Sequence, residues 1–198
     1  MRNEEKNYSR FSLIFFLCLF LRLIPFRAPN VEPIMAAAMP TSRAYGALSG
    51  FSFAALSILL YDLITHTLGM HTFFTAGAYG LIGLTAAYYF TKKEISKWDY
   101  VRFAIFGTLF FDAVTGLTIG PIFFHQSFTQ SLVGQIPFTA LHLLGNIAFA
   151  YFLSPAIYNF MIKSRRPKGS GFRLKASEKN KPEIAFPFIA SINNPKII

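Results

Sequence analysis

Polar and ionisable side chains lie within or beside the long apolar stretches of this chain, where such groups are costly to bury. Carboxylates, amides and imidazoles can hold a small molecule by hydrogen bonds and charge. Inside a membrane protein they usually line a cavity. They come from distant parts of the sequence, so helices must bring them together if they form one site. The candidate substrate-binding residues are Arg27, Asn30, Glu32, Asp62, His66, Asp112, His125, Gln135, His142 and Asn146.

The composition is that of a membrane protein. The 198 residues are 53% hydrophobic, include 24 phenylalanines and have a mean hydropathy of +0.41. The net charge of +10 does not indicate nucleic-acid binding, because the aromatic residues lie in apolar spans and not among the basic ones. Basic residues that flank apolar spans instead face the cytoplasm and attract anionic lipid. We therefore expect a multi-pass protein of the cell membrane that contacts lipid and binds no nucleic acid.

Apolar stretches predict transmembrane helices at 11–25, 44–65, 72–91, 101–120 and 136–160. Arg22, near the end of the first span, is expected to reach the membrane interface with its long side chain. A weaker segment at 31–41 is a candidate for one more span. In the 44–65 span, Gly46, Gly50 and Ala54 recur every four residues, which predicts close packing against another helix.

The distribution of Lys and Arg predicts the topology. Lys92 and Lys93 follow the 72–91 span, and more basic residues follow Lys163. Both regions are therefore expected inside, as is the basic N-terminus. These assignments agree only if the chain crosses twice before residue 44, which makes 31–41 a crossing. The predicted fold is an all-α integral membrane protein with six transmembrane helices and both termini cytoplasmic. The expected divisions are a cytoplasmic N-terminus (1–10), a membrane domain (11–162) and a basic, disordered cytoplasmic tail (163–198).

This topology places the candidate residues in the outer half of the membrane, where a polar-aromatic link is expected at 120–135. Local explanations also exist. Asp62 could pair with His66 on one helix face, and Glu32 could pair with Arg27. His142 and Asn146 share a helix face and could tie the last span to a neighbour. Asp112 lies near mid-span, where a buried acid favours a functional role or a partner on another span.

Metal and cofactor sites are not expected. The single cysteine, Cys18, excludes an intramolecular disulfide and a cysteine cluster. His66 and His71 are five residues apart, so they do not share one helix face as a pair of metal ligands would. No Walker motif is present, so the sequence does not indicate ATP hydrolysis by that route.

Three segments resemble a known family: RLIPFRAPNVEP (22–33), YDLIT (61–65) and FDAVTGLTIGP (111–121). They are similar to the substrate-binding S components of energy-coupling factor (ECF) vitamin transporters, over residues 11–162. The resemblance implies a six-helix protein that captures a vitamin or similar micronutrient from outside. It also implies partners, namely a membrane T component and cytoplasmic ATPase subunits. The first span, FSLIFFLCLFL (11–21), lacks the Ala-xxx-Ala face with which many S components dock on the T component.

An intramembrane hydrolase is one alternative. HLLGN (142–146) has the His-xxx-Asn spacing of rhomboid proteases, and Ser52 could act as the nucleophile if it met His142. In rhomboids, however, that pair precedes the serine, and a small residue stands where Phe53 follows Ser52 here. A membrane scaffold without a ligand is the other alternative. The sequence therefore favours a binding protein that is not an enzyme.

Overall fold

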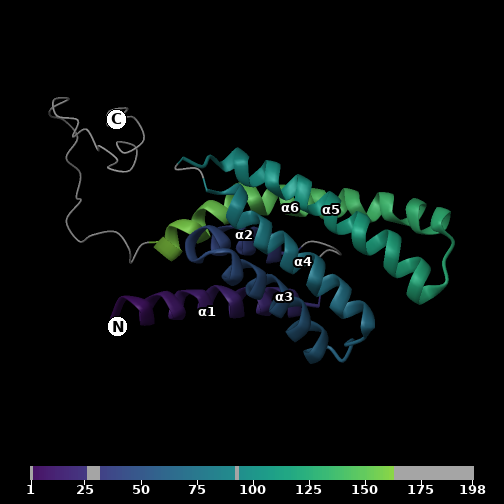
Figure 1. The fold of residues 1–198 in the computed structure, drawn as a ribbon, viewed down its shortest axis with the longest axis horizontal. Coiled ribbons are helices and arrows are strands. Elements are labelled where there is room, and N and C mark those ends of the chain that lie inside the picture. Colours follow the sequence, from purple (N-terminus) through teal and green to yellow (C-terminus); the bar gives the residue numbers. More distant parts are fainter. Residues whose placement is uncertain (1, 26–31, 92–93, 163–198) are drawn as a thin grey trace, which may run out of the picture. The chain divides into compact units, whose positions relative to one another are not determined.

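The computed structural model describes residues 2–25, 32–91 and 94–162, and this part of the chain is helical with short connections. Figure 1 shows the helices packed lengthwise against one another. They are α1 (Arg2–Leu23), α2 (Ile34–Tyr45), α3 (Ala47–Ile64), α4 (Met70–Tyr89), α5 (Lys97–Phe124) and α6 (Phe128–Ile162). The predicted all-α class is confirmed for this part. The predicted tail, 163–198, lies outside the described residues.

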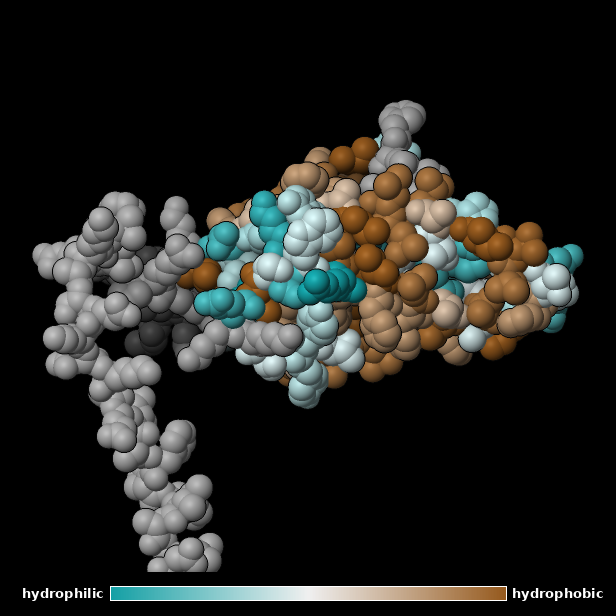
Figure 2. All heavy atoms as spheres, turned by 90° about the horizontal axis from the view of Figure 1, so that it is seen from above, coloured by the Kyte–Doolittle hydropathy of each residue, from teal (hydrophilic) through white to brown (hydrophobic). Residues whose placement is uncertain are grey.

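Three helices, α3, α5 and α6, are long and apolar enough to cross a membrane. Large apolar side chains are exposed on these helices, including Leu48, Phe106 and Phe152. Figure 2 shows apolar residues over much of one face of the helical part. Exposed apolar surface of this extent is typical of a protein that faces lipid. These helices indicate a membrane protein.

Helix α2 is short and buried. Its residues from Ile34 to Met39 are at most 1% exposed, because α2 packs against α3, α4, α5 and α6. Its 12 residues rise only about 18 Å, whereas the hydrocarbon core of a bilayer is about 30 Å thick. The weak segment predicted at 31–41 does form a helix, which begins and ends a few residues later, at Ile34 and Tyr45. Its crossing of the membrane stays a prediction.

Helices α1 and α2 enter the bundle from one end. Arg10 in α1 donates to the Met161 carbonyl near the end of α6 (3.4 Å), and Arg22 reaches the Ser57 carbonyl midway along α3 (3.1 Å). Thr41 in α2 lies beside Met161 again, with Oγ1 3.9 Å from Sδ. Helix α1 therefore runs from the Met161 end at least to the level of Ser57 in α3, and α2 runs back toward Met161. The start of α3 and the end of α6 consequently lie at the same end as Arg10.

The connection between α5 and α6 is shorter than predicted. The link expected at 120–135 is mostly helical, and α6 begins at Phe128 instead of 136. The reason is a capping box, in which the backbone N–H of Gln130 donates to Ser127 Oγ and the Ser127 N–H donates to Gln130 Oε1. His125, with φ at 52°, ends α5 in the left-handed conformation.

Helices α3 and α4 approach closely through glycines, as the small-residue face predicts. A methyl group at Gly50 would lie 2.6 Å from the Gly83 carbonyl oxygen, which also accepts a hydrogen bond from Ser42 of α2. Backbone therefore packs on backbone here, and three helices meet at one carbonyl.

We predict that Gly50→Ala destabilises the protein, because the backbone contact with Gly83 cannot yield to a new methyl group. Overpacking of this kind costs about 1–3 kcal/mol. Gly77→Ala in α4 is the matched control, since its methyl group would meet nothing within 4 Å. Thermal unfolding in detergent, followed by circular dichroism, should show a lower midpoint for Gly50→Ala alone. Equal midpoints would contradict the close approach.

Candidate functional site

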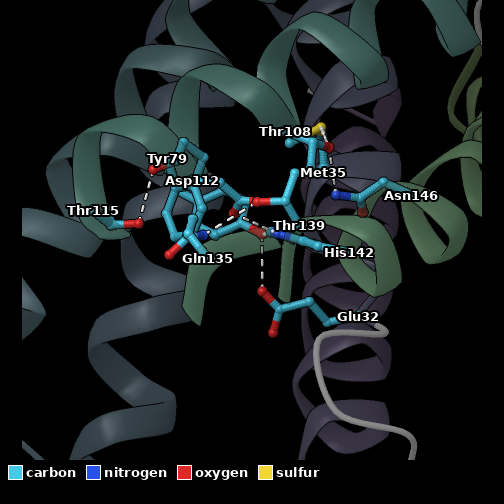
Figure 3. A network of polar contacts seen from close by, with 11 residues as sticks. Glu32, Met35, Tyr79, Thr108, Asp112, Thr115, Gln135, Thr139, His142 and Asn146 are labelled. Carbon is cyan, nitrogen blue, oxygen red and sulfur yellow. Dashed lines mark hydrogen bonds and ion pairs between the residues drawn. The ribbon is translucent and has the colours of Figure 1, made fainter. Parts of the chain in front are cut away.

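A buried chain of polar contacts joins four helices and the segment before α2. We call Arg22, Glu32, Tyr79, His142 and Asp112 the polar chain; each is at most 8% exposed. Arg22 Nε lies 2.9 Å from Glu32 Oε2, and Tyr79 Oη donates to Glu32 Oε1 at 2.9 Å. His142 Nε2 lies 3.2 Å from Tyr79 Oη, and His142 Nδ1 lies 2.8 Å from Asp112 Oδ1 (Figure 3). The predicted inter-span partner of Asp112 is therefore His142.

The hydrogen-bond donors and acceptors of the polar chain determine how many protons the polar chain holds. The Glu32 carboxylate, paired with Arg22, can only accept, so Tyr79 donates its one proton to it. The Tyr79 oxygen must then accept from His142 Nε2, which carries a proton. One further proton lies between His142 Nδ1 and Asp112 Oδ1, because two bare acceptors would not approach to 2.8 Å.

The polar chain is consequently neutral as a whole. The pair of His142 and Asp112 has no net charge either as imidazolium with carboxylate or as imidazole with carboxylic acid. Arg22 and Glu32 also cancel. Burial of isolated charges in this position would cost several kcal/mol each. The cancellation of charge within the polar chain lowers the free-energy cost of burying it.

Arg22 is held by α3 as well as by Glu32. Its Nη1 donates to the Ser57 carbonyl, and the centre of its guanidinium lies 4.0 Å from the centre of the Tyr61 ring. The expectation that Arg22 reaches the membrane interface is therefore wrong. Its side chain instead turns inward, because a carboxylate, a backbone carbonyl and an aromatic face compensate its charge there.

A second pair of polar side chains joins α5 and α6, one helical turn away from the pair of Asp112 and His142. Asn146 Nδ2 donates to Thr108 Oγ1 at 2.8 Å, and Thr108 and Asn146 stand four residues from Asp112 and His142 respectively. Figure 3 shows the pair of Asp112 and His142 and the pair of Thr108 and Asn146 near each other. The predicted shared face of His142 and Asn146 does tie α6 to a neighbour. Asp112 Oδ2 and Asn146 Oδ1 are buried and have no hydrogen-bond partner in the described part of the chain.

A cavity of about 820 Å³ lies beside the polar chain. Pockets that bind small molecules have volumes of about 300–1,000 Å³, so this one is large enough for a vitamin-sized molecule. Its walls come from the end of α1, the segment before α2, the adjoining halves of α3 and α4, and the adjoining halves of α5 and α6. Among its lining residues are Arg22, Glu32, Asp62, His71, Thr75, Tyr79, Phe111, Thr115, Phe124, Gln126, Gln130, Ser131, Gln135, Phe138 and His142.

The candidate residues fall into distinct groups in the structure. Those that line the cavity are Glu32, Asp62, Gln135 and His142. Asp112 and Asn146 are buried behind it, where they hold other side chains. His66 and His125 are exposed, have positive φ and are not among the residues that line this cavity, so their place in a binding site stays a prediction. Arg27 and Asn30 lie outside the described residues.

Asp62 and Glu32 each have a partner ten residues away in the sequence. Asp62 does not pair with His66, because α3 ends at Ile64 and His66 turns away; Asp62 Oδ2 instead accepts from Thr72 Oγ1 at 2.7 Å. Glu32 takes Arg22 as an ion-pair partner. Any contribution from Arg27 lies outside the described residues.

Sequence reasoning missed Arg22 and Tyr79 as site residues. Arg22 looked like the end of a span, and only the fold shows that Glu32 lies beside it. Tyr79 lies in an apolar helix without any distinguishing neighbour, so no sequence signal could have identified it. No group of three or more metal-ligating side chains occurs in the described ranges. The hydrogen bonds of His142 go to Tyr79 and Asp112, and none in those ranges joins it to Ser52.

Comparison with protein-family models, with curated proteins and with solved structures finds no match for this chain. The function must therefore be argued from the site.

We predict that Arg22→Met strongly destabilises the protein, because it removes the guanidinium that pairs with the buried Glu32 carboxylate. Removal of one member of a buried pair costs about 3–5 kcal/mol. Arg102→Met is the matched control, since the Arg102 side chain is 73% exposed and its pair with Asp99 is worth about 1 kcal/mol or less. Thermal unfolding of the purified variants should show a large loss only for Arg22→Met. A loss no larger than that of Arg102→Met would show that the pair does not stabilise the fold.

Proposed function

We propose that this chain is the membrane-embedded, substrate-binding S component of an ECF-type importer. It captures a vitamin or similar micronutrient from outside the cell. Uptake is driven by ATP hydrolysis in cytoplasmic ATPase subunits, which a membrane T component connects to this chain. In this proposal the chain itself is not an enzyme.

The observation that carries the proposal is the cavity and the polar chain beside it. Arg22, Glu32, Tyr79 and His142 reach this cavity from four separate parts of the chain. Buried polar groups in a membrane protein are expensive and usually serve a ligand or an ion. A cavity of vitamin size with such groups at its wall supports capture of a small molecule, which the resemblance to S components also implies.

Six crossings with both termini in the cytoplasm belong to the same proposal. Arg10 and Arg43 lie near the last turns of α6, beside Met161 and Tyr158. Lys97 begins α5 at that end. Basic residues favour the cytoplasmic side, so this end is assigned to the cytoplasm. The cavity lies toward the opposite end, between the connections α3–α4 and α5–α6, and would open outward.

The proposal is tested by native mass spectrometry of the full-length protein after gentle extraction from its own membrane. We expect a retained small molecule of vitamin mass, together with T-component and ATPase subunits in the extract. A protein with neither a retained molecule nor these subunits would contradict the proposal. In that case, alanine variants of Ser52 and His142 would distinguish a hydrolase from a scaffold.

We predict that Asp112→Asn weakens binding of the retained molecule at least tenfold, by affinity measurement on purified protein. An amide at position 112 cannot share a proton with His142 as the carboxyl group does, so the hydrogen bonding of this cavity-lining imidazole changes. Asp99→Asn is the matched control on the same helix, because Asp99 lies outside this cavity and pairs with Arg102. Unchanged affinity for Asp112→Asn would remove Asp112 from any role in positioning the site.

A further inference from the structure

Among the described residues, the charges that line the cavity do not balance. Arg22, Glu32 and His142 belong to the neutral polar chain, so they bring no net charge to a ligand. The remaining ionisable side chains on the wall are Asp62 and His71. In the part of the chain that the structure describes, no ion pair joins Asp62 to His71 or to any other basic side chain. Within the described ranges, the wall therefore has one carboxylate, that of Asp62, that is not paired with a basic side chain.

Asp62 is half-buried, and its carboxylate has few compensating contacts within the described ranges. It lies in the last turn of α3, where the negative end of the helix dipole disfavours an acid. Its compensation is one hydrogen bond, from Thr72 Oγ1 to Oδ2. The other oxygen, Oδ1, accepts no hydrogen bond within the described ranges, so it is free to meet a ligand.

The rest of the wall suits a ring-containing molecule. Tyr79, Phe111, Phe124 and Phe138 present aromatic rings to the cavity. Aromatic faces attract cations and stack on flat rings. Gln126, Gln130 and Gln135 add neutral amides that can both donate and accept hydrogen bonds.

We propose that the ligand of this cavity is an organic cation with an aromatic ring, whose positive charge pairs with the Asp62 carboxylate. This inference rests on the proposed function, since it names the class of molecule that the cavity captures. The neutral polar chain then acts as an uncharged hydrogen-bonding wall, and the selection for charge comes from Asp62 at the edge of the site.

The test uses the full-length protein in lipid nanodiscs and three probes of nearly equal shape. They are 1-methylquinolinium-3-carboxamide, a cation; quinoline-3-carboxamide, which is neutral; and quinoline-3-carboxylate, an anion. Binding is measured by equilibrium dialysis, with empty nanodiscs subtracted. We expect the cation to bind at least tenfold more tightly than either of the others.

Two variants assign this preference to a residue. Asp62→Asn should weaken binding of the cation at least tenfold and leave binding of the neutral probe within about twofold of wild type. Glu94→Gln is the matched control, because Glu94 is an exposed acid outside this cavity; it should leave all three affinities unchanged. Thermal unfolding of Asp62→Asn confirms that the variant is folded.

The outcomes separate this inference from the proposed function. If the neutral probe or the anion binds as tightly as the cation, or if Asp62→Asn keeps the preference, the cationic ligand is overturned and small-molecule capture stands. A retained native molecule without positive charge overturns it in the same way. If no probe binds and native mass spectrometry finds no retained molecule, both the proposed function and this inference are overturned.

Discussion

The ion pair between Arg22 and Glu32 is the interaction on which the site depends. It allows a guanidinium to be buried between α1 and α3, and it fixes Glu32 as an acceptor. Because Glu32 can only accept, the direction of each following hydrogen bond is determined, through Tyr79 to His142 and Asp112. One buried pair therefore sets both the path of α1 and the proton content of the cavity wall.

The short, buried α2 is the second constraint on the architecture. Its alanines let α4, α5 and α6 approach it closely, and the Ser42 hydroxyl ties it to α4 at Gly83, where Gly50 of α3 also makes contact. Packing in lipid relies on such close approach and on hydrogen bonds between helices, since apolar burial gives little gain there. The tight packing on this side leaves the space for the cavity toward the other end of the bundle.

Much of the fold could be predicted from hydropathy, and the errors have local causes. The apolar spans predicted five of the six helices in the described part, and the distribution of Lys and Arg added the helix near 31–41. The small-residue face predicted the contact between α3 and α4. The early start of α6 was missed because hydropathy outweighed the capping box formed by Ser127 and Gln130. His66 and His125 have positive φ at the ends of α3 and α5, and no span pattern predicts such turns.

The sequence by itself predicted a helical membrane protein, with Glu32, Asp112, His142 and Asn146 among its candidate polar residues. Periodicity and charge carry that information, because each is a property of neighbouring residues. Only the tertiary structure decided which partners they take. Arg22 with Glu32, and His142 with both Asp112 and Tyr79, are contacts between distant segments. They depend on how the helices pack, and packing is decided by the shapes of all the helices together.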